Sequence, residues 1–190
     1  MYLAAALCLL LCGCGKKDAA EAQAVQQRYA ALTGAVAEAE IVSHPEGETR
    51  SFTVRCTCDR TKDTATTTVM APEELAGLSA TVTGEKLLIQ YDGPALAAGV
   101  GDTVSPANCI PYLLRALAEG YVLEVGEETL EDIPCLRLAL DTTDADGEKA
   151  VCTVWLAEEE PVYAELSREG KLLLSVHFTA FQQTKSDGGE

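Results

Sequence analysis

Basic residues are scarce in this sequence of 190 residues. There are 14 Lys and Arg against 30 Asp and Glu, which gives a formal net charge of −16. Negative charge of this size repels nucleic-acid phosphates and anionic membrane surfaces, so nucleic acid is excluded as a partner. A basic protein partner remains compatible with the charge. The hydrophobic share of 47% is enough for a normal core, and the length predicts about one folded domain.

Residue patterns that carry catalysis are also missing. The sequence has two histidines, His44 and His177, and neither stands in an H-E-x-x-H pattern. It contains no G-x-S-x-G elbow and no glycine loop of the kind that cradles phosphate. The acidic stretch DTTDADGEK lacks the spaced ligands and closing glutamate of a calcium loop, so we interpret it as a hairpin turn. We expect a protein that is not an enzyme and uses no metal or cofactor.

The apolar run YLAAALCLLLC at residues 2–12 is shorter than the roughly 20 residues that a membrane-spanning helix needs. Its length is typical of the apolar segment of a signal peptide. The residues that end it, Leu11-Cys12-Gly13-Cys14, resemble the bacterial lipobox. We therefore predict cleavage between Gly13 and Cys14 and diacylation of Cys14, which holds the domain on the extracytoplasmic face of the cell membrane. The alternatives are a buried N-terminal helix and a metal-binding Cys-x-Cys pair.

Five cysteines follow the predicted tether of residues 14–18, and an odd number argues against a complete disulfide framework. Cys56 and Cys58 lie two positions apart in the alternating stretch SFTVRCTC, so they share a strand face with Phe52 and Val54. We predict buried free thiols, which pack as small apolar side chains. One disulfide is the alternative. The five are Cys56, Cys58, Cys109, Cys135 and Cys152.

Hydrophobic periodicity predicts a helix near the start and another in the middle of the chain. Residues 19–42 carry apolar side chains spaced three and four apart, which is typical of an amphipathic helix. In the stretch SPANCIPYLLRALAEG, Ser105 is expected as the N-cap, Pro106 as the first helical residue and Gly120 as the end. The apolar positions of the two helices are Ala22, Val25, Tyr29, Leu32 and Val36, then Leu113, Leu114 and Leu117.

Alternating stretches elsewhere predict about nine or ten antiparallel strands separated by short turns. Trp155 stands at one strand end, where we expect it to pack in the core or at its rim. The sum is an α+β domain over residues 19–183, built as one curved antiparallel sheet or partial barrel with helices on one face. Residues 184–190 are expected to be a disordered tail.

Three phrases resemble LolA-like lipoprotein-sorting domains: APEELAGLSATVTGEKLLIQYDG, SPANCIPYLLRALAEGYV and VWLAEEEPVYAELSREGKLLLSVHFTAF. Among these domains the chain is most similar to germination lipoproteins of the GerS type from spore-forming Firmicutes. The resemblance implies an incomplete antiparallel β-barrel (a half-barrel) with helices covering the concave side. In LolA the cavity holds acyl chains of a lipoprotein in transit, whereas GerS-type proteins support a cortex peptidoglycan amidase during spore formation.

Two functions therefore remain open. The first is a protein-interaction module that supports another envelope protein, for which the resemblance suggests a peptidoglycan amidase. The second is a carrier that binds acyl chains or lipoproteins in the half-barrel. An open cavity of several hundred cubic ångströms would favour the carrier, and a core filled by side chains would exclude it. The candidate cavity-lining residues are Phe52, Val54, Leu123, Val154, Leu174 and Val176.

Overall fold

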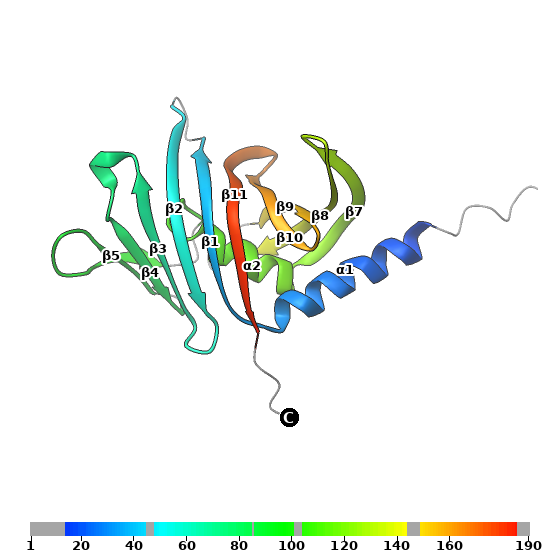
Figure 1. The fold of residues 1–190 in the computed structure, drawn as a ribbon, viewed down its shortest axis with the longest axis horizontal. Coiled ribbons are helices and arrows are strands. Elements are labelled where there is room, and N and C mark those ends of the chain that lie inside the picture. Colours follow the sequence, from blue (N-terminus) through cyan, green and yellow to red (C-terminus); the bar gives the residue numbers. More distant parts are fainter. Residues whose placement is uncertain (1–13, 45–47, 85, 101–103, 144–148, 186–190) are drawn as a thin grey trace, which may run out of the picture.

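The computed structural model describes residues 14–44, 48–84, 86–100, 104–143 and 149–185. Its eleven strands form a single sheet in the order β6-β5-β4-β3-β2-β1-β11-β10-β9-β8-β7 (Figure 1). All neighbouring strands are antiparallel. The strands are β1 (Leu32–Ser43), β2 (Arg50–Asp59), β3 (Thr64–Ala71), β4 (Ser79–Thr83), β5 (Lys86–Gln90), β6 (Leu96–Val100), β7 (Tyr121–Leu130), β8 (Ile133–Thr143), β9 (Lys149–Ala157), β10 (Glu160–Arg168) and β11 (Lys171–Lys185).

The first and last strands of the chain, β1 and β11, pair with each other near the middle of the sheet. One half of the sheet therefore runs outward from β1 through β2 to β6, and the other runs from β11 through β10 to β7. Two α-helices accompany the sheet, α1 (Cys14–Ala30) and α2 (Cys109–Glu119), with a short 3-10 helix η1 (Glu73–Leu75). Figure 1 shows α2 lying across one face of the sheet and α1 leading away toward the side of β7.

The predicted N-terminal helix is right for its first part and wrong for its second. Ala22, Val25 and Tyr29 are buried on α1, as the helical spacing predicts. The helix ends at Ala30, however, and the residues from Leu32 to Ser43 form β1. Alternate burial of the small residues in the segment 35–41 explains the difference, because a period of two suits a strand that is paired on both sides.

Gly34 fixes how closely β1 approaches β2. A Cβ atom on Gly34 would lie 2.7 Å from the carbonyl oxygen of Cys58, a contact that the two backbones cannot accommodate without moving apart. Glycine is therefore needed here for close strand packing, whereas the sequence prediction treats it as a weak position in a helix.

Besides β1, strand β6 is also not predicted from the sequence. Its stretch LAAGV shows no alternation of apolar and polar residues and holds a glycine, so it carries no strand signal. Together β1 and β6 explain why the sheet has eleven strands where the sequence predicts nine or ten.

Helix α2 begins later than the sequence predicts. Its N-cap is Asn108, where the sequence predicts Ser105, and Gly120 ends the helix as expected. The Asn108 side chain accepts hydrogen bonds from the Ser105 backbone nitrogen at 2.8 Å and from the Ser105 hydroxyl at 3.0 Å, which folds the segment 105–108 into a turn. Pro111 then lies in the first turn of α2, where a missing backbone N–H costs nothing.

The hydrophobic core joins both helices to the sheet. Tyr29 of α1 and Leu113 and Leu117 of α2 are buried in one cluster with Ile41, Val54 and residues of β8–β11. Burial of each large aliphatic side chain stabilises the fold by about 1.5–3 kcal/mol. Tyr29 also donates a hydrogen bond through its hydroxyl to the Glu159 carbonyl oxygen at 3.0 Å, which ties α1 to the β9–β10 turn.

The predicted signal peptide, residues 1–13, lies outside the described residues, and Cys14 is the first residue of α1. The predicted disordered tail, residues 184–190, is wrong at its start, because Thr184 and Lys185 end β11 and pair with β1; residues 186–190 lie outside the described residues. Within the described ranges, neither helix is both long enough and apolar enough to cross a bilayer.

Candidate functional site: a groove between helix α2 and the first strands

A cavity of about 330 Å³, partly open to solvent, lies where the end of α1 and one side of α2 meet strands β1 to β4. Its volume is at the lower end of the range typical of small-molecule sites, about 300–1,000 Å³. It is lined by Tyr29, Leu32, Gly34, Ala35, Cys58, Asp59, Arg60, Asp63, Thr64, Ala65, Val82, Gly84, Asn108, Pro111, Tyr112, Leu114, Arg115 and Glu119.

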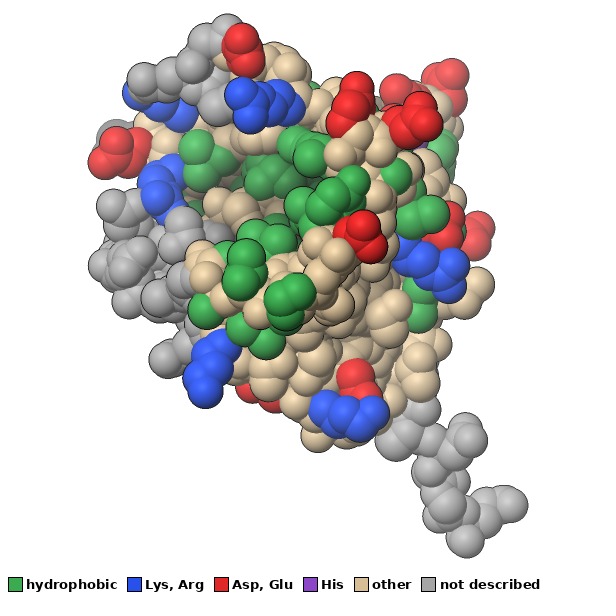
Figure 2. Space-filling model, turned by 90° about the vertical axis from the view of Figure 1, so that its left-hand side faces the viewer, with side chains coloured by type: hydrophobic (Ala, Val, Ile, Leu, Met, Phe, Trp, Pro, Cys, Tyr) green, Lys and Arg blue, Asp and Glu red, His purple; other side chains and the backbone are tan. Residues whose placement is uncertain are grey.

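The inner wall of this groove is apolar. Leu32 and Ala35 on β1, Ala65 on β3 and Leu114 on α2 are buried beneath it, and the half-buried Val82 closes it from β4. Figure 2 shows hydrophobic side chains gathered on the side of the molecule that carries β4 and β5, with charged side chains around them. An apolar wall of this kind favours a hydrocarbon chain, because burial of apolar area is the main source of affinity.

Charged residues stand at the rim of the groove. Arg60 donates a hydrogen bond from Nη1 to the Tyr29 carbonyl oxygen at 2.8 Å, and its Nη2 lies 3.4 Å from Glu119 Oε1. One arginine thus connects the β2–β3 turn to the end of α1 and the end of α2. The Arg115 guanidinium lies over the Tyr112 ring, 5.3 Å from its centroid. The rim therefore offers both signs of charge beside an apolar interior, which suits an amphiphilic ligand.

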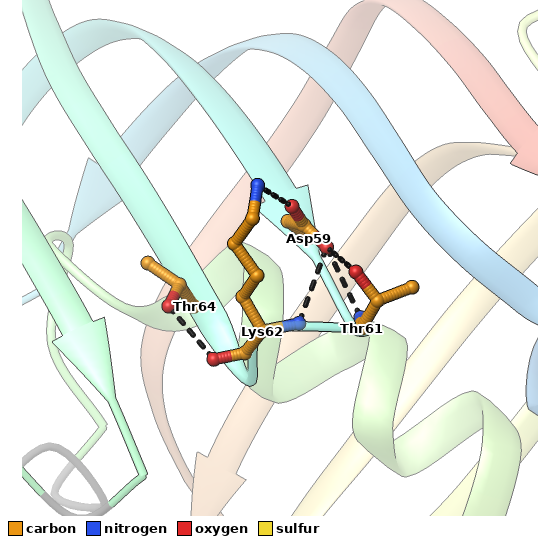
Figure 3. A network of polar contacts seen from close by, with 4 residues as sticks. All are labelled: Asp59, Thr61, Lys62 and Thr64. Atoms are coloured by element: carbon orange, nitrogen blue, oxygen red, sulfur yellow. Dashed lines mark hydrogen bonds and ion pairs between the residues drawn. The ribbon is translucent and has the colours of Figure 1, made fainter.

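The β2–β3 turn that carries Arg60 is held by Asp59 (Figure 3). Asp59 Oδ1 accepts hydrogen bonds from the Thr61 backbone nitrogen at 3.1 Å, the Thr61 hydroxyl at 2.6 Å and the Lys62 backbone nitrogen at 3.3 Å. Its Oδ2 lies 2.7 Å from Lys62 Nζ. These bonds, chiefly those from the Lys62 side chain and then Thr61, lower the pKa of Asp59 from 3.8 to about 2. The turn is thus fixed by an ionised carboxylate.

The cysteines lie largely in the core. Cys56, Cys58, Cys109, Cys135 and Cys152 carry free thiols, and of these five Cys58 alone is half-buried. Cys58 lines the groove, and Cys56 lies behind it with its Sγ 3.7 Å from Cys58 Sγ. Burial raises the pKa of Cys152 to about 12 and that of Cys109 further, so these two thiols remain protonated at neutral pH.

The cavity-lining residues that the sequence predicts do not line this groove. Val54, Val154, Leu174 and Val176 are at most 2% exposed and packed in the core, and Phe52 packs against it. Leu123 is 51% exposed on β7. A register shift between Val122 and Glu124 in the pairing of β7 with β8 turns Val122 inward and Leu123 outward. Alternation identifies the core face of the other five residues but not that of Leu123, and it carries no information on where the core is left unfilled.

A second, shallower cavity of about 520 Å³ lies between α1 and the β7–β8 hairpin. Its rim carries four glutamates, Glu21, Glu127, Glu128 and Glu159, and Arg28 forms an ion pair with Glu159. Four carboxylates beside one arginine make it less suited to an apolar ligand than the first groove.

The remaining candidate residues occupy structural positions. His177 is exposed on β11, and His44 is half-buried just after β1. Trp155 is buried, with its ring 5.3 Å from that of Tyr163 and the Arg137 guanidinium 5.8 Å above it. In the part of the chain that the structure describes, no group of three or more His, Cys, Asp or Glu side chains is placed to hold a metal ion.

No protein-family model and no curated protein matches the sequence, but several solved structures share its fold. A LolA superfamily protein from Nitrosomonas europaea has a TM-score of 0.51 at 10% identity, over 85% of this chain and 92% of that one. The lipoprotein LppX from Mycobacterium tuberculosis has a TM-score of 0.51 at 14% identity, over 88% of this chain and 96% of that one. LprF from Mycobacterium bovis has a TM-score of 0.52 at 10% identity, over 88% of this chain and 93% of that one. The open antiparallel sheet with its two helices is therefore a LolA-like fold.

Proposed function

We propose that the chain is an envelope lipoprotein that binds one apolar or amphiphilic ligand in the groove between α2 and strands β1 to β4. The observation that carries this proposal is the groove itself, about 330 Å³ with an apolar wall and a rim of both charges. Its volume suits one hydrocarbon chain better than the several chains of a triacylated lipoprotein. The LolA-like fold supports the proposal. In this proposal the sheet is a half-barrel, and the two helices cover its concave side.

In this proposal residues 1–13 are a signal peptide, Cys14 carries the lipid anchor, and residues 19–183 are a binding domain without catalytic activity. The domain would work on the extracytoplasmic face of the cell membrane. A domain that is itself anchored presents or retains its ligand near the membrane, whereas a soluble carrier transports it.

The test is binding of a fluorescent fatty acid to the purified full chain, followed by titration. Val82→Trp places an indole in the groove and should weaken binding at least tenfold. Val162→Trp is the matched control, because Val162 is also half-buried on a strand, β10, but does not line the groove. Equal binding by Val82→Trp and the wild type would overturn the proposal, as would a wild type that takes up no probe.

A second candidate function is docking of an envelope protein, and exposed apolar side chains favour it. Met70, Leu88, Tyr91 and Leu96 are all exposed on β3, β5, β6 and the turn between β5 and β6. The sequence resemblance to GerS-type proteins suggests a peptidoglycan amidase as the partner and spore formation as the setting. Met70→Lys with Leu88→Lys, two exposed residues on the same face of the sheet, should abolish co-purification with an amidase from the same membrane, whereas Tyr121→Lys, at an exposed site on β7, should not.

A further inference from the structure

Two thiols meet at the wall of the groove. Cys56 and Cys58 project from the same face of β2, and their sulfur atoms are 3.7 Å apart. Cys56 is completely buried, while Cys58 is half-buried and lines the groove. A small molecule in the groove can therefore reach Cys58, and it can reach Cys56 only through Cys58.

The surroundings give the two thiols different chemical roles. The Thr67 hydroxyl on β3 donates a hydrogen bond to Cys56 Sγ at 3.4 Å. The pKa of Cys56 is lowered, chiefly by the hydrogen bond from the Cys58 thiol. Burial acts in the opposite direction, and the hydrogen bond from the Thr67 hydroxyl lowers the pKa further. The pKa of Cys58 is raised, because its proton is held between the two sulfurs and the site is buried. A thiolate on Cys56 thus has two donors, and Cys58 carries the accessible sulfur.

We propose that Cys56 and Cys58 form a reversible dithiol–disulfide site that exchanges with a small-molecule disulfide entering the groove. The Cys58 thiol passes its proton to the Cys56 thiolate beside it and attacks one sulfur of the small disulfide RSSR, which forms a mixed disulfide on Cys58 and releases one RS⁻. The released RS⁻ then takes the proton from Cys56. Cys56 thiolate then attacks Cys58 Sγ and displaces the second RS⁻. The sum converts one protein dithiol and one RSSR into one protein disulfide and two RSH, with the two thiol protons passing to the released thiolates.

Strand geometry makes this disulfide easy to reduce. Residues two apart in an antiparallel strand are separated by roughly 6.8 Å, at about 3.4 Å for each residue. Disulfides join Cα atoms that are about 4.4–6.8 Å apart, so β2 must contract slightly for the bond to close. Strained disulfides have more oxidising potentials and exchange more readily, which distinguishes this pair from a permanent structural bridge.

The other described thiols are poorly placed for the same reaction. Cys109 and Cys152 are fully buried and have strongly raised pKa values, caused mainly by desolvation. Cys135 lies on β8 beside the second cavity, with its thiol donating to the Ile133 carbonyl oxygen at 3.4 Å. The proposal is independent of which ligand the groove holds.

The test is a redox titration of the purified full chain in mixtures of oxidised and reduced glutathione. Samples are acid-quenched, unfolded, alkylated and analysed by peptide mass spectrometry. We expect Cys56 and Cys58 to lose alkylation together, to appear in one peptide lighter by two hydrogens, and to recover with dithiothreitol. The proposal is overturned if both stay fully alkylated at the most oxidising ratio, or if Cys56 pairs with Cys109.

Variants separate the two roles. Cys56→Ser retains the accessible sulfur, so glutathione should remain attached to Cys58. Thr67→Val should slow release of glutathione from Cys58 and make the mixed disulfide accumulate, because the Cys56 thiolate loses a donor. Cys135→Ser, the matched control, should titrate like the wild type. Rapid release of glutathione in Cys56→Ser would contradict the assignment of Cys56 as the resolving thiol.

Discussion

The two halves of the sheet bury side chains of different size. On β8 to β11 most buried positions hold large side chains, such as Leu138, Leu140 and Leu166, although small ones such as Ala150 and Ala164 occur among them. On β1 to β4 many of them hold small ones; these include Ala35, Ala37, Ala39, Cys56, Ala65, Thr67 and Ala80. The apolar groove lies against the half with the small residues.

We infer from this difference that side-chain volume determines where the groove opens, even though the hydrogen-bonded strand pairing continues across both halves. Leu138 and Leu166 fill the space above their strands and leave no room for a ligand. Ala35 and Ala65 end at Cβ, so α2 leaves space above them that its own side chains do not fill. The groove therefore depends on small core residues such as Ala35 and Ala65.

The largest loss of stability is expected from a substitution in the half of the sheet with large buried side chains, β8 to β11. Leu166→Ala removes a completely buried side chain and should lower the free energy of unfolding by about 2–5 kcal/mol, because the cavity cannot collapse. Leu114→Ala on α2 should cost about 1 kcal/mol less, since that side chain already borders the groove and alanine favours a helix. Urea unfolding followed by circular dichroism measures both. Equal losses would show that the two halves are packed alike.

The wall of the groove can be tested at Gly34. Gly34→Ala places a Cβ atom 2.7 Å from the Cys58 carbonyl oxygen, so β1 and β2 must separate beside the groove. We expect a loss of about 1–3 kcal/mol, in the range of overpacked sites, together with weaker binding of the fatty-acid probe. Gly126→Ala on β7 is the matched control, because no atom lies within 4 Å of its added Cβ. An unchanged Gly34→Ala variant would mean that close strand approach is unnecessary.

Much of this fold was predictable from sequence because period-two alternation and turn residues mark antiparallel strands. The stretch from Phe52 to Cys58 was assigned to the correct faces, and the apolar side of α2 was correct at Leu113, Leu114 and Leu117. The segment 32–42 was not predictable, because alanines at both helical and strand spacing fit either period. Its strand state comes from pairing with β2 and with β11, which lies far along the chain.

The candidate site was less predictable than the fold. A groove is a volume that side chains leave empty, and alternation shows only which way each side chain points. The sequence identified Cys58 as an inward-facing residue but could not show that Ala35, Ala65 and Val82 leave room beside it. The rim depends on a long-range contact from Arg60 to Tyr29 and Glu119, which no local pattern indicates.

The smallest expected effect concerns Asp59, which holds the turn at the rim of the groove. Its pKa is lowered in the folded state to about 2 from 3.8, so its stabilising effect is complete above 3.8 and is lost as pH falls through about 2. Asp59→Asn should therefore reduce the dependence of the urea midpoint on pH between pH 5 and roughly pH 2. Asp92→Asn, at the exposed β5–β6 turn, should keep the pH dependence of the wild type. If Asp59→Asn follows the wild-type curve throughout, the carboxylate does not stabilise the turn, and the position of Arg60 depends on its own contacts.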